Sequence, residues 1–202
     1  MVLLGNNLIE GSEVAHLKNL GYNNTIINCK FVGENIEIGN NCTLKNVIVG
    51  SGTHITDSYM EDALIGKDCK IGPFTRVRGK TVIGDNCKVG NFVEIKNSEL
   101  GRGVKASHLS YIGDAMVGDN TNVGCGVVFA NYNGKTKNIT IVGKKCFIGS
   151  HVTLVAPLKI EDDSYVCAGT VVTKSTDKGD FVIGRCRAEK KDNYAYYLKN
   201  KE

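Results

Sequence analysis

The sequence predicts an all-β fold, a parallel β-helix in which short strands wind into coils that stack along one axis. Three observations support this prediction: an aliphatic residue followed by glycine recurs at six-residue steps, glycine occurs 24 times against 2 prolines, and aromatic residues make up 7% with no tryptophan. A six-residue period is too long for a helical turn and too short for the strands of a hairpin barrel. Small branched side chains suit the narrow core of a coil.

The six-residue repeat defines the strands. Each strand contributes one inward aliphatic side chain, and the glycine that follows accepts a backbone turn that a Cβ would oppose. Three strands close one coil of about eighteen residues. The aliphatic–glycine pairs are Val32-Gly33, Ile38-Gly39, Ile65-Gly66, Ile71-Gly72, Ile83-Gly84, Val89-Gly90, Val117-Gly118, Val123-Gly124, Val142-Gly143 and Ile148-Gly149, and further aliphatics keep the period at Val77, Leu154, Ile160, Val166 and Val172.

The chain divides into three predicted parts. Residues 1–30 form an N-terminal flank with a short helix over 10–21, residues 31–184 form the β-helix, and residues 185–202 form a tail with a second short helix. The start of the chain lacks the cationic residues and long apolar run of a secretory signal, and no stretch has the length of a membrane span. We therefore expect a cytoplasmic protein with no membrane partner.

Interruptions of the period mark corners or loops. The step shortens to five residues from Leu44 to Val49, Ile95 to Leu100 and Ile112 to Val117, and it lengthens to ten from Ile55 to Ile65. The longest interruption runs from Phe129 to Val142 and contains the polar segment ANYNGKTKNITI. We expect this segment to leave the coil as a loop, and loops on a rigid scaffold are common binding sites.

The eight cysteines are predicted to be reduced thiols, because the chain shows no export signal, no CxxC pair and no spacing typical of a metal site. Four of them follow a repeat aliphatic by four residues and are expected to point into the core as small stacked side chains. These four are Cys42, Cys69, Cys87 and Cys146.

The charge balance favours small anionic ligands. The formal net charge is +4 and the isoelectric point is near 8.5. No block of basic residues is interleaved with aromatic ones, so nucleic acid is not predicted as a partner.

The segment from Ile71 to Arg185 contains the runs IGPFTRVRG, VGNFVEIK, KASHLSYIGDAMVGDNTNVGCG, ANYNGKTKN, FIGSHVTLVAP, CAGTVVT and VIGR. It resembles the carboxy-terminal acetyltransferase domain of the bacterial bifunctional N-acetylglucosamine-1-phosphate uridyltransferase/glucosamine-1-phosphate N-acetyltransferase, over a little more than half of the chain. KASHLSYIGDA followed by NYNGKTK is far more specific than the repeat alone.

This resemblance implies left-handed coils, an exception to the usual handedness of parallel crossovers. It also implies a homotrimer with active sites between neighbouring subunits, acetyl-CoA as co-substrate, and an amino sugar phosphate, foremost glucosamine-1-phosphate, as acceptor. The chain has no room for a uridyltransferase domain and no glycine-rich nucleotide loop, so we expect a stand-alone acetyltransferase.

His108 is the candidate general base. Acetyl transfer from a thioester to an amine needs a free lone pair on the amine, and an imidazole that titrates near neutral pH can take its proton. In the family the matching histidine has this role; the alternative is a histidine that only bonds between coils. The other histidines, His16, His54 and His151, lie on different turns, so their spacing does not predict a zinc site.

The acceptor site is predicted from four family positions that hold the sugar phosphate, namely Arg78, Lys96, Tyr111 and Lys137, and from Asn122, which matches a sugar-hydroxyl contact. Three cations and a phenol suit a phosphate dianion, although each cation alone would commonly be a solvated surface charge. Gly79 stands after Arg78 where the family usually has proline.

The acetyl-CoA site is predicted from six further positions. Asn131 and Tyr132 correspond to residues that orient the amine and line the acetyl-CoA channel, while Ser150, Ala168 and Arg185 match CoA contacts. Cys125 stands where the family usually has alanine, and its backbone N–H corresponds to the donor for the developing oxyanion. The tail is a candidate cover for the CoA 3′-phosphate of a neighbouring subunit or simply a solvated helix.

Two other functions fit the same sequence. The acceptor can be a different amino sugar or a nucleotide-linked sugar, which keeps the chemistry and changes the substrate. The chain can also be a non-catalytic trimeric binding scaffold, as solenoids often are.

Overall fold

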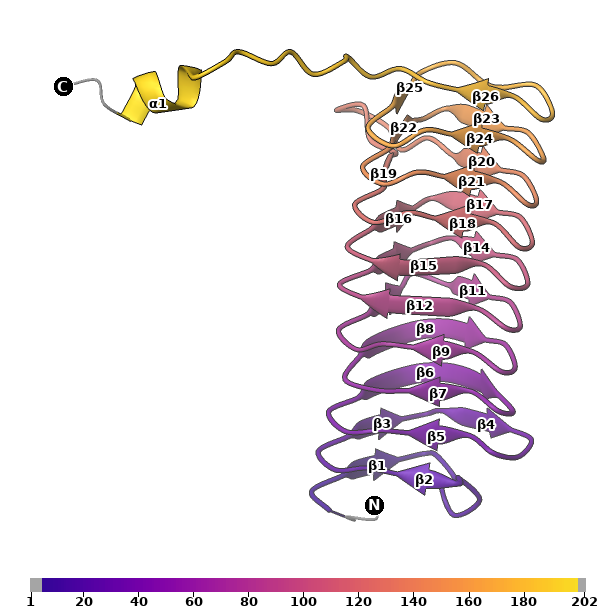
Figure 1. Ribbon diagram of the computed structural model, residues 1–202. Helices are drawn as coiled ribbons and strands as arrows, with labels where there is room; N and C mark the ends of the chain where they lie inside the picture. Colours follow the sequence, from indigo (N-terminus) through magenta and orange to yellow (C-terminus); the bar gives the residue numbers. More distant parts are fainter. Residues whose placement is uncertain (1–4, 200–202) are drawn as a thin grey trace.

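The computed structural model describes residues 5–199, and they form a single stack of parallel coils (Figure 1). The first four residues of the predicted flank and the last three of the predicted tail lie outside this range. The strands form two hydrogen-bonded sheets, of sixteen and of ten strands. Val77 pairs with Ile95, which pairs with Ile112, so consecutive coils are 18 and 17 residues apart here. The predicted β-helix is confirmed.

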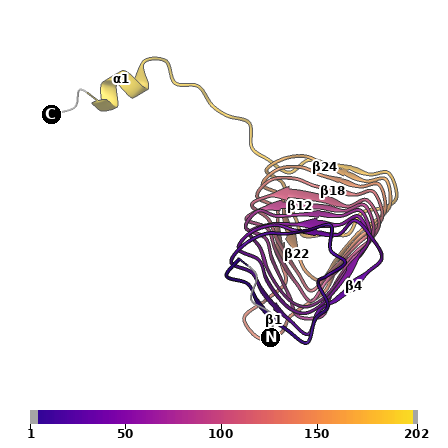
Figure 2. The same cartoon turned by 90° about the horizontal axis from the view of Figure 1, so that it is seen from below.

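Each coil has three faces, which give the stack its triangular outline when seen along the axis (Figure 2). Face A comprises β1 (Leu8–Glu10), β3 (Thr25–Ile27), the first parts of β6 (Thr43–Gly50) and β8 (Tyr59–Ile65), β10 (Arg76–Arg78), β13 (Glu94–Lys96), β16 (Tyr111–Gly113), β19 (Val128–Ala130), β22 (Thr153–Val155) and β25 (Val171–Val172). Face B comprises β4 (Lys30–Val32), the second parts of β6 and β8, β11 (Thr81–Ile83), β14 (Glu99–Leu100), β17 (Ala115–Val117), β20 (Thr140–Val142) and β23 (Leu158–Ile160).

Face C is the ten-stranded sheet. It comprises β2 (Asn19–Leu20), β5 (Glu37–Ile38), β7 (His54–Ile55), β9 (Lys70–Ile71), β12 (Lys88–Asn91), β15 (Lys105–His108), β18 (Asn122–Val123), β21 (Phe147–Ile148), β24 (Tyr165–Val166) and β26 (Phe181–Val182). In Figure 1 its strands run to the left at the front, and the strands of faces A and B run to the right behind them as the chain climbs. The coil is therefore left-handed.

The corner between faces A and B, here called the A–B corner, explains the five-residue steps. One residue in the left-handed backbone region makes the turn, with φ between 48° and 53°, at Asn28, Asn46, Asp62, Asn97 and Asp114. Asparagine and aspartate tolerate this conformation better than other residues with a Cβ.

The ten-residue step from Ile55 to Ile65 was expected to hold a corner or loop, but it contains the inward residue Met60. Met60 is fully buried and belongs to β8, so two five-residue steps follow one another there. A second correction concerns Val32, which is 45% exposed because Phe31 is the inward side chain of β4.

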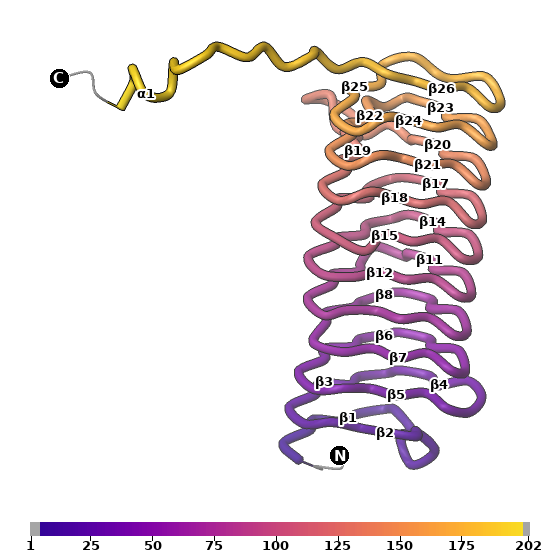
Figure 3. Tube along the Cα trace, in the orientation of Figure 1, coloured from indigo at the N-terminus to yellow at the C-terminus, as the bar shows by residue number. Residues whose placement is uncertain are grey.

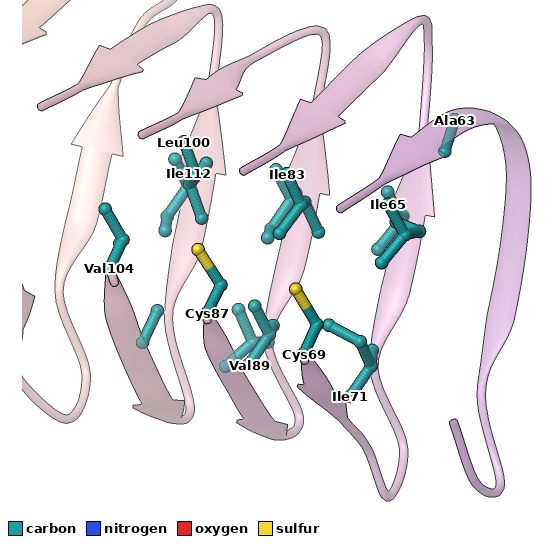
Figure 4. Close-up of a cluster of buried hydrophobic side chains, with 14 of the residues drawn as sticks. Ala63, Ile65, Cys69, Ile71, Ile83, Cys87, Val89, Leu100, Val104 and Ile112 are labelled. Carbon is teal, nitrogen blue, oxygen red and sulfur yellow. The ribbon is translucent and has the colours of Figure 1, made fainter. Parts of the chain in front are cut away.

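The core is a column of aliphatic side chains and thiols inside the coils (Figure 4). The four cysteines predicted to point inward are all buried, as predicted. The Cys69 thiol donates to the Gly84 carbonyl at 3.1 Å, and the Cys87 thiol donates to the Gly101 carbonyl at 3.1 Å. Burial raises the pKa of Cys42 to about 11, so this thiol stays protonated at neutral pH.

The amino-terminal region differs from the predicted flank. The strands β1 and β3 lie within it, β1 pairs with β3, and β3 pairs with β6, so the stack begins well before residue 31. The helix predicted over 10–21 does not form, because Val14, Leu17 and Leu20 pack against the end of the core from turns and from β2.

The carboxy-terminal tail leaves the last coil and extends away from the stack (Figure 3). It ends in α1 (Tyr194–Lys199), the short helix that was predicted. Within residues 5–199, no helix has the length and apolar character needed to cross a bilayer.

The polar segment after β19 leaves the stack as a loop, as predicted. It does so at the A–B corner and projects beside β22 (Figure 1). Val117 pairs with Val142, 25 residues later, so this coil carries the extra residues as a loop. We call residues 131–139 the ejected loop. It is closed by a bridge between Tyr132 and Lys137 and by a turn in which the Asn133 side-chain oxygen accepts from the backbone of Lys135 and Thr136.

Candidate active site

The predicted site residues divide into two groups at opposite edges of face A. The first group surrounds the A–B corner and the ejected loop and is called the cationic corner: Arg78, Lys96, Tyr111, Asn131, Lys137 and, in addition, Asp114. The second group follows the edge between faces C and A and is called the C–A column: His108, Cys125, Ser150 and Ala168.

Asp114 lies at the centre of the cationic corner. Its Oδ2 lies 3.2 Å from Lys96 Nζ, and these side chains are only 14% (Lys96) and 9% (Asp114) exposed. Asn97 Nδ2 donates to Asp114 Oδ1 at 2.7 Å, and Asn131 Nδ2 donates to Asp114 Oδ2. Burial alone would raise the pKa of Asp114, but the hydrogen bonds from Asn97, Lys96 and Asn131 outweigh burial and lower it. Asp114 is therefore a carboxylate at neutral pH.

Tyr111 adds a phenol to the same corner. Asn131 Nδ2 lies 3.4 Å from the Tyr111 hydroxyl, which extends over Gly113 of the same strand. A Cβ at Gly113 would collide with this hydroxyl, so glycine is what lets the phenol reach the corner.

The three cations of the corner differ in how fully a carboxylate neutralises them. Arg78 is held by Glu94, with Nη2 and Nε at 2.7 and 2.9 Å from Oε1. Lys96 is shared with Asp114, while Lys137 from the ejected loop lies beside Lys96, whose ammonium lowers the pKa of Lys137. The positive charge of Arg78 acts in the same direction. One aspartate thus faces two lysines, and the corner keeps positive charge that an anion can neutralise.

The C–A column has one member in each successive coil. Asn91 pairs with His108 at the end of β12 and β15, and the later members stand two residues after the paired positions Val123, Ile148 and Val166. Neighbouring coils are about 4.8 Å apart, so the column presents one side chain per step along the edge. His108, Ser150 and Ala168 are exposed and Cys125 is half-buried.

Backbone hydrogen bonds fix this column. Cys125 O accepts from His151 N at 2.7 Å, and Ser150 O accepts from Gly169 N at 2.9 Å. Arg185 Nη1 donates to Ala168 O at 3.2 Å, which brings Arg185 to the upper end of the column. The structure therefore places His108 in line with four of the positions predicted for acetyl-CoA.

Two predicted residues lie apart from both groups. Asn122 lies in β18 on face C. It pairs with Lys105 of β15 on one side and with Phe147 of β21 on the other. Tyr132 lies in the ejected loop, is 60% exposed and donates through its hydroxyl to Gly134 O at 2.7 Å. Among residues 5–199, no three His, Cys, Asp or Glu side chains are grouped as metal ligands.

Sequence reasoning missed Asp114, Asn97 and Glu94. Their only signal was position: Asp114 stands in the run YIGDA directly before an inward alanine, where the corner needs a residue that tolerates left-handed backbone. Nothing in the sequence distinguishes it from Asp62, which occupies the same place in an earlier coil.

Comparison with known proteins agrees with this architecture. Residues 62–97 match the family model of the bacterial transferase hexapeptide (six repeats), and residues 139–174 match that of the hexapeptide repeat of succinyl-transferase. The chain is 45% identical over 157 residues to the Bifunctional protein GlmU of Chromobacterium violaceum, covering 77% of this chain and 34% of that protein. It is 44% identical over 182 residues to the Bifunctional protein GlmU of Geobacillus sp. (strain WCH70), covering 90% and 40%.

The chain thus spans 34–40% of the length of these two relatives. Among solved structures, it is similar to a putative acetyltransferase from Desulfovibrio desulfuricans G20, with 16% identity, a TM-score of 0.48 and coverage of 91% of this chain and 56% of that one.

Proposed function

We propose that this chain is a hexapeptide-repeat acyltransferase that transfers the acetyl group of acetyl-CoA to the amine of an amino sugar phosphate, foremost glucosamine-1-phosphate. The observation that carries the proposal is the cationic corner, where two lysines and a partly neutralised arginine converge beside a buried aspartate and an amide.

The cationic corner supports a phosphate-bearing acceptor. A phosphate dianion between Lys96 and Lys137 would relieve their mutual repulsion, and Lys137 would regain a pKa closer to that of an ordinary lysine. The Tyr111 hydroxyl can donate to the same anion, as phenols do in phosphate sites. Arg78 is bound to Glu94 through Nη2 and Nε, and its remaining N–H groups can donate to the phosphate.

The C–A column supports acetyl transfer itself. His108 would accept the proton of the acceptor amine as that nitrogen attacks the thioester carbonyl. The carbonyl oxygen gains negative charge in this step, and the Cys125 N–H, at the corner one coil beyond His108, would donate to it. The electron pair of the broken C–S bond would leave with the CoA thiolate. Ser150, Ala168 and Arg185 continue the column, and we propose that they hold CoA.

Within one chain the two groups lie at opposite edges of face A, which is three residues wide at β16. We infer a homotrimer with active sites between neighbouring subunits, in which the cationic corner of one subunit faces the C–A column and Asn122 of the next. Face B supports association, since apolar side chains project from it at Ile48, Leu64, Val82, Met116 and Ile141, and each is between 37% and 48% exposed. Glu99 stands in the same row, between Val82 and Met116.

A cytoplasmic location fits this proposal. All eight cysteines are free thiols, and seven of them are at least partly buried within the coils. Such thiols persist in a reducing compartment.

Release of the CoA thiol, followed with a thiol-reactive dye, tests the proposed function. We expect release from acetyl-CoA that depends on glucosamine-1-phosphate, and little release with glucosamine or with inorganic phosphate alone. A panel that adds other amino sugars and nucleotide-linked sugars measures the acceptor preference. Absence of turnover with every acceptor, in a preparation shown to be folded, would overturn the proposal.

A further inference from the structure

The ejected loop and the cationic corner meet at one side chain, Asp114. Its Oδ2 accepts from Asn131, which belongs to the predicted acetyl-CoA site, and pairs with Lys96, which belongs to the predicted acceptor site. The other carboxylate oxygen accepts from Asn97 at 2.7 Å. Asp114 therefore connects residues that were assigned to two different substrates.

Asp114 departs from the other members of its corner in burial. Asp62 makes the same turn, with φ of 50° at both residues, but its side chain is exposed and accepts one side-chain hydrogen bond, from Asn46 at 2.9 Å. The turn itself thus needs neither the burial of Asp114 nor its three donors. A buried carboxylate that accepts from three residues fixes the positions of those three side chains, and they fix its position in turn.

The contact with Asn131 fixes the orientation of that amide. A carboxylate only accepts hydrogen bonds, so Asn131 must turn its NH₂ group toward Asp114 and its oxygen away. The second N–H direction leads to the Tyr111 hydroxyl. The Asn131 oxygen is then the end of the amide that can accept from the amine of an acceptor, which a flipped amide could not do.

The contact with Lys96 sets the position of the ammonium that would bind the acceptor phosphate. Asp114 holds the Lys96 ammonium in a place where it still lies beside Lys137. The carboxylate also offsets part of the repulsion between the two lysines, since the negative charge of Asp114 acts to raise the pKa of Lys137. Without the carboxylate, the lysines would move apart or lose a proton.

We propose that Asp114 is a positioning residue that couples the two ends of the acceptor site, holding the amide of Asn131 for the acceptor amine and the ammonium of Lys96 for the acceptor phosphate. This inference rests on the proposed function. Asp114 itself touches neither substrate in this arrangement, so its effect passes through Asn131 and Lys96.

The test compares Asp114→Asn with Asp62→Asn in the full chain. Asparagine has the same shape and tolerates the left-handed turn, so both variants are expected to fold, which thermal unfolding checks. For Asp114→Asn we expect kcat to fall about 10- to 100-fold, because a misplaced substrate group has an effect of this size. We also expect a higher KM for the sugar phosphate. Asp62→Asn should change neither.

Two further measurements separate positioning from mere stability. In an Asn131→Ala background, Asp114→Asn should lower kcat by much less than it does alone, because the amide it orients is gone. The acceptor KM of Asp114→Asn should also begin to rise at a lower pH than that of the wild type, because Lys137 loses the support of the carboxylate. Equal activities of Asp114→Asn and Asp62→Asn, or additive effects with Asn131→Ala, would overturn the coupling.

Calorimetric titration with CoA and with glucosamine-1-phosphate separates this inference from the proposed function. A wild type that binds both but does not turn over refutes the proposed reaction, and Asp114→Asn must then still weaken sugar phosphate binding if the coupling is correct. A wild type that binds neither ligand refutes both.

Discussion

At the scale of single residues, His108 is the base that the proposed reaction needs, and it is exposed at the end of β15. We expect His108→Ala to lower kcat about 10²- to 10⁴-fold, the range for loss of one positioned base. Because the side chain contributes nothing to the core, the melting temperature should stay close to that of the wild type. Steady-state kinetics and thermal unfolding check this. Near-normal turnover of the variant would remove His108 from its role.

Lys137 gives a second prediction at this scale. The neighbouring Lys96 lowers the pKa of Lys137, so its charge is lost at a lower pH than that of an ordinary lysine. The phosphate binds the protonated form, and therefore the acceptor KM should rise as the pH rises through this lowered pKa. Lys137→Arg keeps its charge throughout and should move this rise to higher pH. The pH profile of kcat/KM for the acceptor measures the difference; identical alkaline limbs would contradict it.

Sequence alone identified the substrate-facing candidates but not the side chains that hold them. Lys96 and Lys137 were found from motifs, whereas Asp114 meets Lys96 across a pairing 18 residues away and meets Asn131 17 residues along the chain. Coils here advance by 17 or 18 residues, and a shift of one residue would turn the neighbouring side chain elsewhere. The register between neighbouring coils, which only the folded structure gives, decides which polar side chains form contacts.

At the scale of elements, the six-residue period was sufficient for most inward positions, because each strand has one inward side chain and a turn. It failed at Val32, where Phe31 turns inward, and at Met60, which is neither aliphatic-branched nor followed by glycine. The helix predicted over 10–21 failed for a related reason. Val14, Leu17 and Leu20 are spaced as on a helix, yet they pack against the end of the core from turns and from β2.

The ejected loop can be tested as an independent element. Removing residues 132–138 deletes seven residues and shortens the step from Val117 to Val142 from 25 to 18, the step found between Val142 and Ile160. We expect the stack to close with a melting temperature within a few degrees of the wild type, since surface loops add little to stability. Acceptor turnover should be lost together with Lys137. A large loss of cooperative unfolding would show that the loop supports the fold.

At the scale of the whole molecule, the sequence period leaves handedness and assembly open, because a six-residue step closes three faces in either sense. The arrangement of the site residues adds what the period lacks. Residues expected to act on one small substrate stand at two separate edges of the left-handed stack, and the proposed homotrimer would bring these edges together between subunits.

Mixing two inactive variants tests this division. His108→Ala disables the C–A column and Lys96→Ala disables the cationic corner, so each pure protein should have little activity. In a trimer that contains both variants, one of the three sites between neighbours combines two unaltered halves, which gives about one third of the wild-type activity. Co-expression with two affinity tags, followed by assay of the doubly purified trimers, measures this recovery. If both halves of the site came from the same chain, no mixture of the two variants would regain activity.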